Sequence, residues 1–91
     1  MGLWINDSGA STAEIEAGVA AAEDFFENVG CSPLQCAMKV RELSYRKEGD
    51  DWHVEQEYLA DYWREAENAA FAAAFEGWAE YPPGAVMVWE G

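Results

Sequence analysis

Two cysteines and one histidine are the most chemically versatile side chains of this 91-residue sequence. Cys31 and Cys36 lie five positions apart, and His53 is the single imidazole. These three residues cannot supply four soft ligands at the spacing of a structural zinc site. The sequence also lacks an EF-hand loop and a glycine-rich phosphate-binding loop. We therefore expect no metal ion and no cofactor.

Two side chains could in principle carry acid–base chemistry. His53 titrates near neutrality, but a hairpin predicted around it places it on the outer face between Arg46 and Glu55. Glu67 falls in the apolar sector of a predicted helix, where it either reaches solvent at the edge or meets a partner such as Arg64. Nucleophilic catalysis needs a nucleophile beside a base, and no such pair is indicated. We expect the protein not to be an enzyme.

Charge is the strongest signal in the sequence. The 18 Asp and Glu outnumber the 5 Lys and Arg, which gives a formal net charge of −13. Four of the five basic residues lie in segment 39–47, so the charged side chains of the rest of the chain are almost all negative. Phosphates would be repelled, which argues against direct binding to nucleic acid. No apolar run is long enough for a membrane span, and the N-terminal residues lack signal-peptide features, so a cytoplasmic protein is expected.

The carboxylates form rows on the predicted elements. Glu16, Glu23 and Glu27 fall within about 40° of one another on a helix, about 10.5 Å and 6 Å apart along its axis. Such rows cost folding stability through self-repulsion, so we expect them to serve binding, with solubility as the alternative explanation of the acidity. Exposed aromatic rings would add desolvated anchors. The predicted partner-binding residues are Glu16, Glu23, Asp24, Glu27, Asp50, Asp51, Glu55, Glu57, Trp52 and Tyr62.

Two helices are predicted in the N-terminal half. Residues 11–14 read Ser-Thr-Ala-Glu, a capping box that begins a helix, and Gly30 closes it in the left-handed conformation. Ser32-Pro33-Leu34-Gln35 is a second start signal, with Ser32 as N-cap, Pro33 at the first helical position and Gln35 as the capping-box partner. Cys31 and Cys36 then occupy the two positions of a hydrophobic staple, although a small disulfide or a reactive thiol are alternatives. The apolar stripe of the first helix consists of Ile15, Val19, Ala22, Phe26 and Val29.

The remaining elements complete an α+β prediction. Residues 40–58 alternate in polarity around the turn 48–51, which indicates a hairpin, with a helix over 50–60 as the alternative. Asp61 caps a helix through about Ala79, and residues 85–89 form a last strand beside residues 3–5. We therefore predict one domain over residues 1–91, in the order βααββαβ. Its helices pack on one face of a small, mostly antiparallel sheet.

In charge, size and α+β content, the chain resembles the small acidic DNA-mimic inhibitors of phages and plasmids. These include anti-CRISPR and anti-restriction proteins and uracil-glycosylase inhibitors. The resemblance implies a non-enzymatic inhibitor that occupies the basic nucleic-acid-binding cleft of a protein partner. The alternative is an acidic adaptor or immunity-type protein that binds through an exposed aromatic patch. Self-repulsion favours a monomer, and a dimer would need strong apolar contact.

Overall fold

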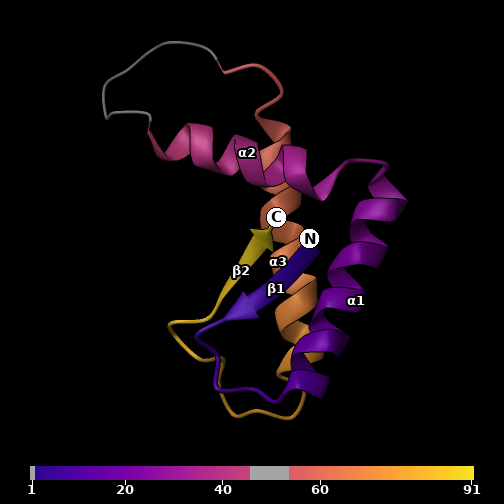
Figure 1. The fold of residues 1–91 in the computed structure, drawn as a ribbon, viewed down its shortest axis with the longest axis vertical. Helices are drawn as coiled ribbons and strands as arrows, with labels where there is room; N and C mark the ends of the chain where they lie inside the picture. The colour runs from indigo at the N-terminus through magenta and orange to yellow at the C-terminus, as the bar shows by residue number, and fades with distance from the viewer. Residues whose placement is uncertain (1, 46–53) are drawn as a thin grey trace.

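The computed structural model describes residues 2–45 and 54–91. Along the chain a first strand is followed by three helices and a last strand, and the two strands lie side by side (Figure 1). Strands β1 and β2 pair antiparallel, with Leu3 opposite Trp89 and Ile5 opposite Met87. The α+β class and the pairing of the first and last strands are therefore confirmed. The elements are β1 (Gly2–Asn6), α1 (Thr12–Val29), α2 (Pro33–Ser44), α3 (Tyr58–Ala74) and β2 (Val86–Glu90).

Helix α1 has the boundaries that its sequence signals predict. The Ser11 side chain accepts a hydrogen bond from the Glu14 backbone N–H (3.2 Å), and the Glu14 carboxylate accepts one from the Ser11 N–H (2.9 Å). Gly30 ends the helix with φ 71°, a conformation that costs glycine little. The predicted capping box and C-terminal glycine are confirmed.

Helices α1 and α3 run side by side in opposite directions and form the main layer of the core (Figure 1). Gly18 makes their close approach feasible. A Cβ at this position would lie 2.7 Å from the Ala70 carbonyl oxygen and 2.9 Å from the Ala74 Cβ. Small residues therefore line the α1–α3 contact at Gly18, while the larger side chains of Phe26 and Trp63 pack against each other, with ring centroids 6.0 Å apart.

The two-stranded sheet lies against the helices through one face. Leu3, Ile5 and Met87 are buried in the same core cluster as Phe26 and Trp63. The side chains of the neighbouring strand residues point away from the helices, because successive side chains of a strand lie on opposite faces of the sheet. Trp4 and Val88 on that outer face are half-buried, and Val86 is 41% exposed.

The predicted hairpin over residues 40–58 is wrong within the described residues. Residues 40–44 continue α2, and α3 begins at Tyr58. Cys36, Val40 and Leu43 also recur at steps of four and three, which fits a helix, and packing of α2 against α3 and β2 selects the helix over the strand. Before α3 the chain turns at Gln56, whose φ is 56°, and Val54 is buried. The expected order βααββαβ is thus replaced by βαααβ in the described part of the chain.

Helix α3 is shifted toward the N-terminus relative to the prediction of 61–79. Its N-cap is Glu57 instead of Asp61, and it ends at Ala74. Gly77, with φ 84°, turns the chain out of the helix. The predicted apolar face is otherwise present, since Trp63, Ala70, Ala74 and Phe75 are buried. The residues predicted to point away from the core are exposed: Asp61, Glu65, Asn68 and Glu76.

Candidate partner-binding surfaces

The predicted carboxylate row on α1 is exposed in the structure. Glu16, Glu23 and Glu27 follow one side of the helix, and Asp24 lies one step around it. Helix α1 contains no lysine, arginine or histidine. Phe26 and Gly30 form a shallow concavity of about 410 Å³ with Glu23, Glu27 and the start of α2. The row therefore borders a hollow surface at the corner between α1 and α2.

None of these four carboxylates makes an ion pair within residues 2–45 and 54–91. The pairs found there join Lys39 to Glu42 (2.9 Å) and Arg64 to Asp61 (2.8 Å). Asp24 and Glu27 also lie toward the C-terminal end of α1, where the helix dipole is negative and disfavours an acidic side chain. Neither local pairing nor helix stability therefore explains this part of the row.

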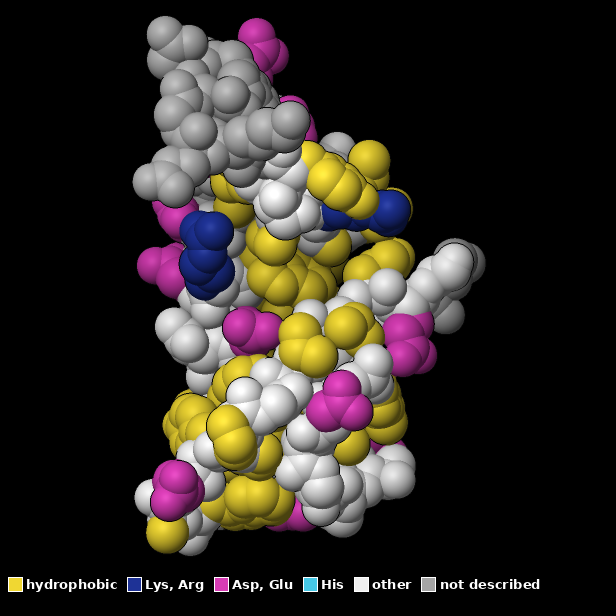
Figure 2. Space-filling model, turned by 90° about the vertical axis from the view of Figure 1, so that its left-hand side faces the viewer, with side chains coloured by type: hydrophobic (Ala, Val, Ile, Leu, Met, Phe, Trp, Pro, Cys, Tyr) yellow, Lys and Arg dark blue, Asp and Glu magenta, His cyan; other side chains and the backbone are white. Residues whose placement is uncertain are grey.

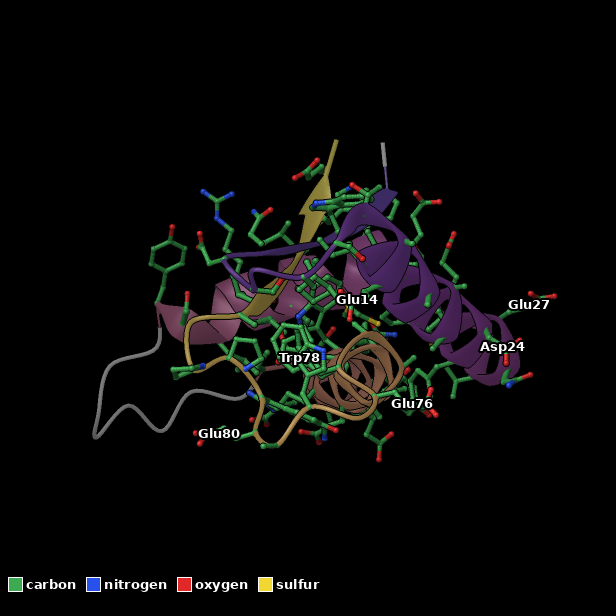
Figure 3. All side chains as sticks on the ribbon, turned by 90° about the horizontal axis from the view of Figure 1, so that it is seen from below. Glu14, Asp24, Glu27, Glu76, Trp78 and Glu80 are labelled. Carbon is green, nitrogen blue, oxygen red and sulfur yellow. The ribbon has the colours of Figure 1, made fainter. Side chains whose placement is uncertain are left out.

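Glu14 is an acid on α1 with a structural role. One carboxylate oxygen accepts the Ser11 backbone N–H, and the other accepts the indole N–H of Trp78 at 3.1 Å. Figure 3 shows the two side chains pointing toward each other from α1 and the loop after α3, away from Asp24 and Glu27. The hydrogen bond from Ser11, followed by that from Trp78, lowers the pKa of Glu14 below its ordinary value.

The second predicted group of contact residues is not on a hairpin. Asp50, Asp51 and Trp52, together with His53, lie outside the described residues. Glu55 and Glu57 are exposed in the turn before α3, and Glu57 already makes an interaction of its own. The structure therefore does not join these acids to the α1 row.

Tyr62 is packed more closely than a free aromatic anchor would be. It is half-buried, with ring-centroid distances of 6.1 Å to Phe25 and 5.5 Å to Tyr58. Tyr58 is the more accessible ring of this trio and is 50% exposed. Tyr58 was not among the predicted contact residues.

Both cysteines are free thiols that pack into the core. Cys36 is fully buried, and Cys31 is half-buried against the same cluster. Burial, with a smaller contribution from Cys31, raises the pKa of the Cys36 thiol to about 11. A thiolate is the reactive form of cysteine, so the buried Cys36 thiol is expected to be unreactive at neutral pH. This arrangement agrees with the packing role expected from the staple positions.

Glu67 has a partner that the sequence did not indicate. Its carboxylate accepts the backbone N–H of Met87 on β2 at 3.0 Å, and Arg64 pairs with Asp61 instead. Glu67 thus ties α3 to the sheet. It also lines a groove of about 540 Å³ between α2, α3 and β2. Sequence patterns could not reveal this groove, because its walls come from three separate elements.

The face of α2 and β2 differs in character from α1. Figure 2 shows basic side chains on either side of a hydrophobic area there. Arg41 and Arg64 line the groove, together with exposed apolar side chains such as Leu34 and Met38. The described chain therefore presents an acidic helix and a separate apolar groove with two arginines.

Comparison of the chain with protein-family models, curated proteins and solved structures gave no match. Among the described residues, no group of three or more His, Cys, Asp and Glu is placed to hold a metal ion. No helix in the same part of the chain has the length and apolar character needed to cross a membrane. The acidic row on α1 and the groove of α2, α3 and β2 are therefore the features of the described chain that bear on function.

Proposed function

We propose that this protein is a non-enzymatic inhibitor that binds the basic nucleic-acid-binding cleft of a protein partner. The observation that supports the proposal is the exposed α1 row, Glu16, Glu23 and Glu27 with Asp24 beside it, which has no basic partner within the described residues. Lysine and arginine side chains that normally hold phosphates would pair with these carboxylates.

The energetics of α1 favour a binding role for the row. Glu23 and Glu27 are four residues apart, a spacing at which like charges destabilise a helix by about 0.2–0.5 kcal/mol. The helix dipole adds a further unfavourable contribution at the C-terminal end. A negative surface increases the rate of association with a basic cleft. This functional advantage would explain why the row is kept although it slightly lowers the free energy of unfolding.

The proposed class of partner follows the resemblance to anti-CRISPR and anti-restriction inhibitors. The partner would be a CRISPR effector, a restriction enzyme or another nucleic-acid-processing protein in the cytoplasm. A rigid helix that carries carboxylates several ångströms apart provides negative charge without bases. Duplex DNA and this protein would then compete for one cleft on the partner.

Affinity capture from a host lysate tests the proposal. Tagged protein should recover a nucleic-acid-binding partner, and added duplex DNA or high salt should displace that partner. The variant with Glu16, Glu23 and Glu27 changed to Gln should recover much less of it. The matched control changes Glu65, Glu76 and Glu80 to Gln, which alters the net charge equally but leaves α1 intact. Equal loss in both variants would exclude a specific role for α1.

An adaptor that binds through aromatic side chains is the second candidate function. Phe25, Tyr58 and Tyr62 form a connected cluster across α1 and α3, and Tyr58 is half exposed. Binding through this cluster should hardly change with salt, whereas binding through the α1 row should weaken steeply. Tyr58→Ala would abolish capture in the adaptor case and leave the charge-led interaction largely intact.

A further inference from the structure

One edge of β2 is not covered by another strand. In the described chain the sheet consists of β1 and β2. Each strand therefore pairs with the other along one edge, and its opposite edge pairs with no strand of the described residues. Met87 donates its backbone N–H to Glu67, which shows that this N–H points away from β1. Backbone groups alternate in direction along an antiparallel strand. The N–H and carbonyl of Trp89 therefore also point to the outer edge, whereas those of Val88 point to β1.

This outer edge has hydrogen-bonding capacity left. Within residues 2–45 and 54–91, neither the Met87 carbonyl nor the Trp89 N–H forms a hydrogen bond at the outer edge of β2. An uncovered strand edge is a template for pairing with an additional strand. Glu67 occupies the Met87 N–H, so this position is closed to an incoming carbonyl.

The groove beside the edge would receive side chains from such a strand. It has a volume of about 540 Å³ and runs along β2 between α2 and α3. Leu34 and Met38 on α2 are 42% and 61% exposed, and Val86 on β2 is 41% exposed. Large apolar side chains with this much exposure beside a strand edge favour an apolar partner.

The charged side chains that line the groove determine which charge a bound partner segment should carry. Arg41 and Arg64 line it, and Glu67 is the acidic side chain in the lining. Glu67 is held by the Met87 N–H, and Arg64 also contacts Asp61. The described chain contains one further basic residue, Lys39, which pairs with Glu42. A groove with two arginines in a protein of net charge −13 thus selects an acidic partner segment.

We propose that the groove binds an extended segment of a partner protein, with apolar and acidic side chains on one face, which adds to β2 as a parallel strand. In a parallel ladder, one residue of the incoming segment donates its N–H to the Met87 carbonyl and accepts the Trp89 N–H. Glu67 leaves both of these groups available, together with the Trp89 carbonyl. An antiparallel neighbour opposite Met87 would need the N–H that Glu67 already holds. On the face of the segment that is turned to the groove, apolar side chains meet the apolar lining, and acidic side chains reach Arg41 and Arg64.

This binding mode is independent of the proposed function, because it does not use the carboxylates of α1. The probe for it is a capped synthetic peptide of about six residues that carries glutamate, valine and glutamate at every second position, with threonine between them, so that both residue types share one face. On titration, the backbone amide of Trp89 should shift in a ¹H–¹⁵N NMR spectrum and become protected from hydrogen exchange. The Val88 amide already bonds to β1 and serves as the internal control.

Two matched peptides and two protein variants separate the contributions. Replacing glutamate by lysine in the peptide should abolish binding, and N-methylation of its alternate amides should weaken binding at least tenfold. Arg41→Gln and Arg64→Gln should each weaken binding by about two- to fivefold. Lys39→Gln, on the same helix as Arg41 but outside the groove, should leave it unchanged. Circular dichroism of each variant verifies folding.

Several results would overturn the proposal. Equal binding of the lysine peptide would remove the charge selection, and equal binding of the N-methylated peptide would exclude strand addition. Protection of the Trp89 amide that rises with protein concentration in the absence of peptide would assign the edge to a second copy of the chain. Absence of any Trp89 response to the valine–glutamate peptide would show that the edge is not a binding site.

Discussion

At the scale of single residues, Glu14 couples the beginning of α1 to the loop after α3. Its carboxylate accepts hydrogen bonds from Ser11 and from the Trp78 indole, and these bonds lower its pKa. A carboxylate with a lowered folded-state pKa stabilises the fold above its unfolded pKa, and this contribution is lost as the pH falls through the folded pKa. The ordinary value for Glu14 is 4.5.

We therefore expect Glu14→Gln to lower the free energy of unfolding at neutral pH and to have less effect in acid. The folded wild-type carboxyl becomes protonated only as the pH falls through its lowered pKa, below the ordinary value of 4.5, and both proteins then have a neutral side chain at this position. Urea denaturation at several pH values measures the difference. Glu16→Gln, which removes an exposed carboxylate two residues further along α1, is the control. A pH-independent difference for Glu14→Gln would contradict the assignment.

Gly18 is a second residue whose side chain, here a hydrogen atom, decides local packing. Gly18→Ala should lower the free energy of unfolding by about 1–2 kcal/mol, because overpacking against Ala70 and Ala74 outweighs the gain in helix propensity. Chemical denaturation checks this expectation. Ala20→Gly, on the exposed side of α1, measures the difference in helix propensity between alanine and glycine without a change in packing. It should lower the free energy of unfolding by about 1 kcal/mol. A stabilised Gly18→Ala protein would rule out the close approach of the two helices.

At the scale of elements, α1 and α2 begin with similar sequence signals but different local structures. Ser11 caps α1 through its side chain, whereas Ser32 makes no side-chain capping bond at the start of α2. The capping box expected from Ser32 and Gln35 is therefore wrong. Pro33 at the first position of α2 still agrees with the predicted start.

This contrast predicts unequal effects of one substitution at two N-caps. Ser11→Ala should lower the free energy of unfolding by about 1 kcal/mol, because an N–H at the start of α1 loses its acceptor. Ser32→Ala should change it by less than about 0.5 kcal/mol. Thermal and urea denaturation of the two variants, measured in parallel, compare the caps. Equal losses would indicate that Ser32 caps α2 in solution.

At the scale of the whole molecule, the net charge of −13 opposes folding. Sodium chloride should therefore raise the free energy of unfolding by screening repulsion between carboxylates. The variant with Glu16, Glu23 and Glu27 changed to Gln should be at least as stable as wild type at low salt and should respond less to added salt. Urea denaturation over a range of sodium chloride concentrations measures both effects.

The same variant should lose partner binding, as the proposed function requires. A gain in stability together with a loss of binding would identify the α1 row as a feature maintained for interaction. A clear loss of stability would instead give these carboxylates a structural role. Capture and denaturation on one protein preparation therefore separate the two interpretations.

The sequence by itself determined the features that depend on neighbouring residues. The Ser11–Glu14 capping box, the left-handed Gly30 and the steps of the apolar stripe are local, and they set the limits of α1. The exposure of Glu16, Glu23 and Glu27 follows from the same helical period. Short apolar runs at residues 3–5 and 85–89 likewise indicated the two terminal strands.

Tertiary structure decided the features that depend on distant residues. Val40 and Leu43 fit either a strand or a helix by local pattern, and packing of α2 against α3 and β2 selects the helix. The Glu67–Met87 bond joins residues 20 positions apart, and the Glu14–Trp78 bond joins residues 64 apart. Such contacts arise only when separate elements meet. The groove of α2, α3 and β2, with its two arginines, is a product of that assembly.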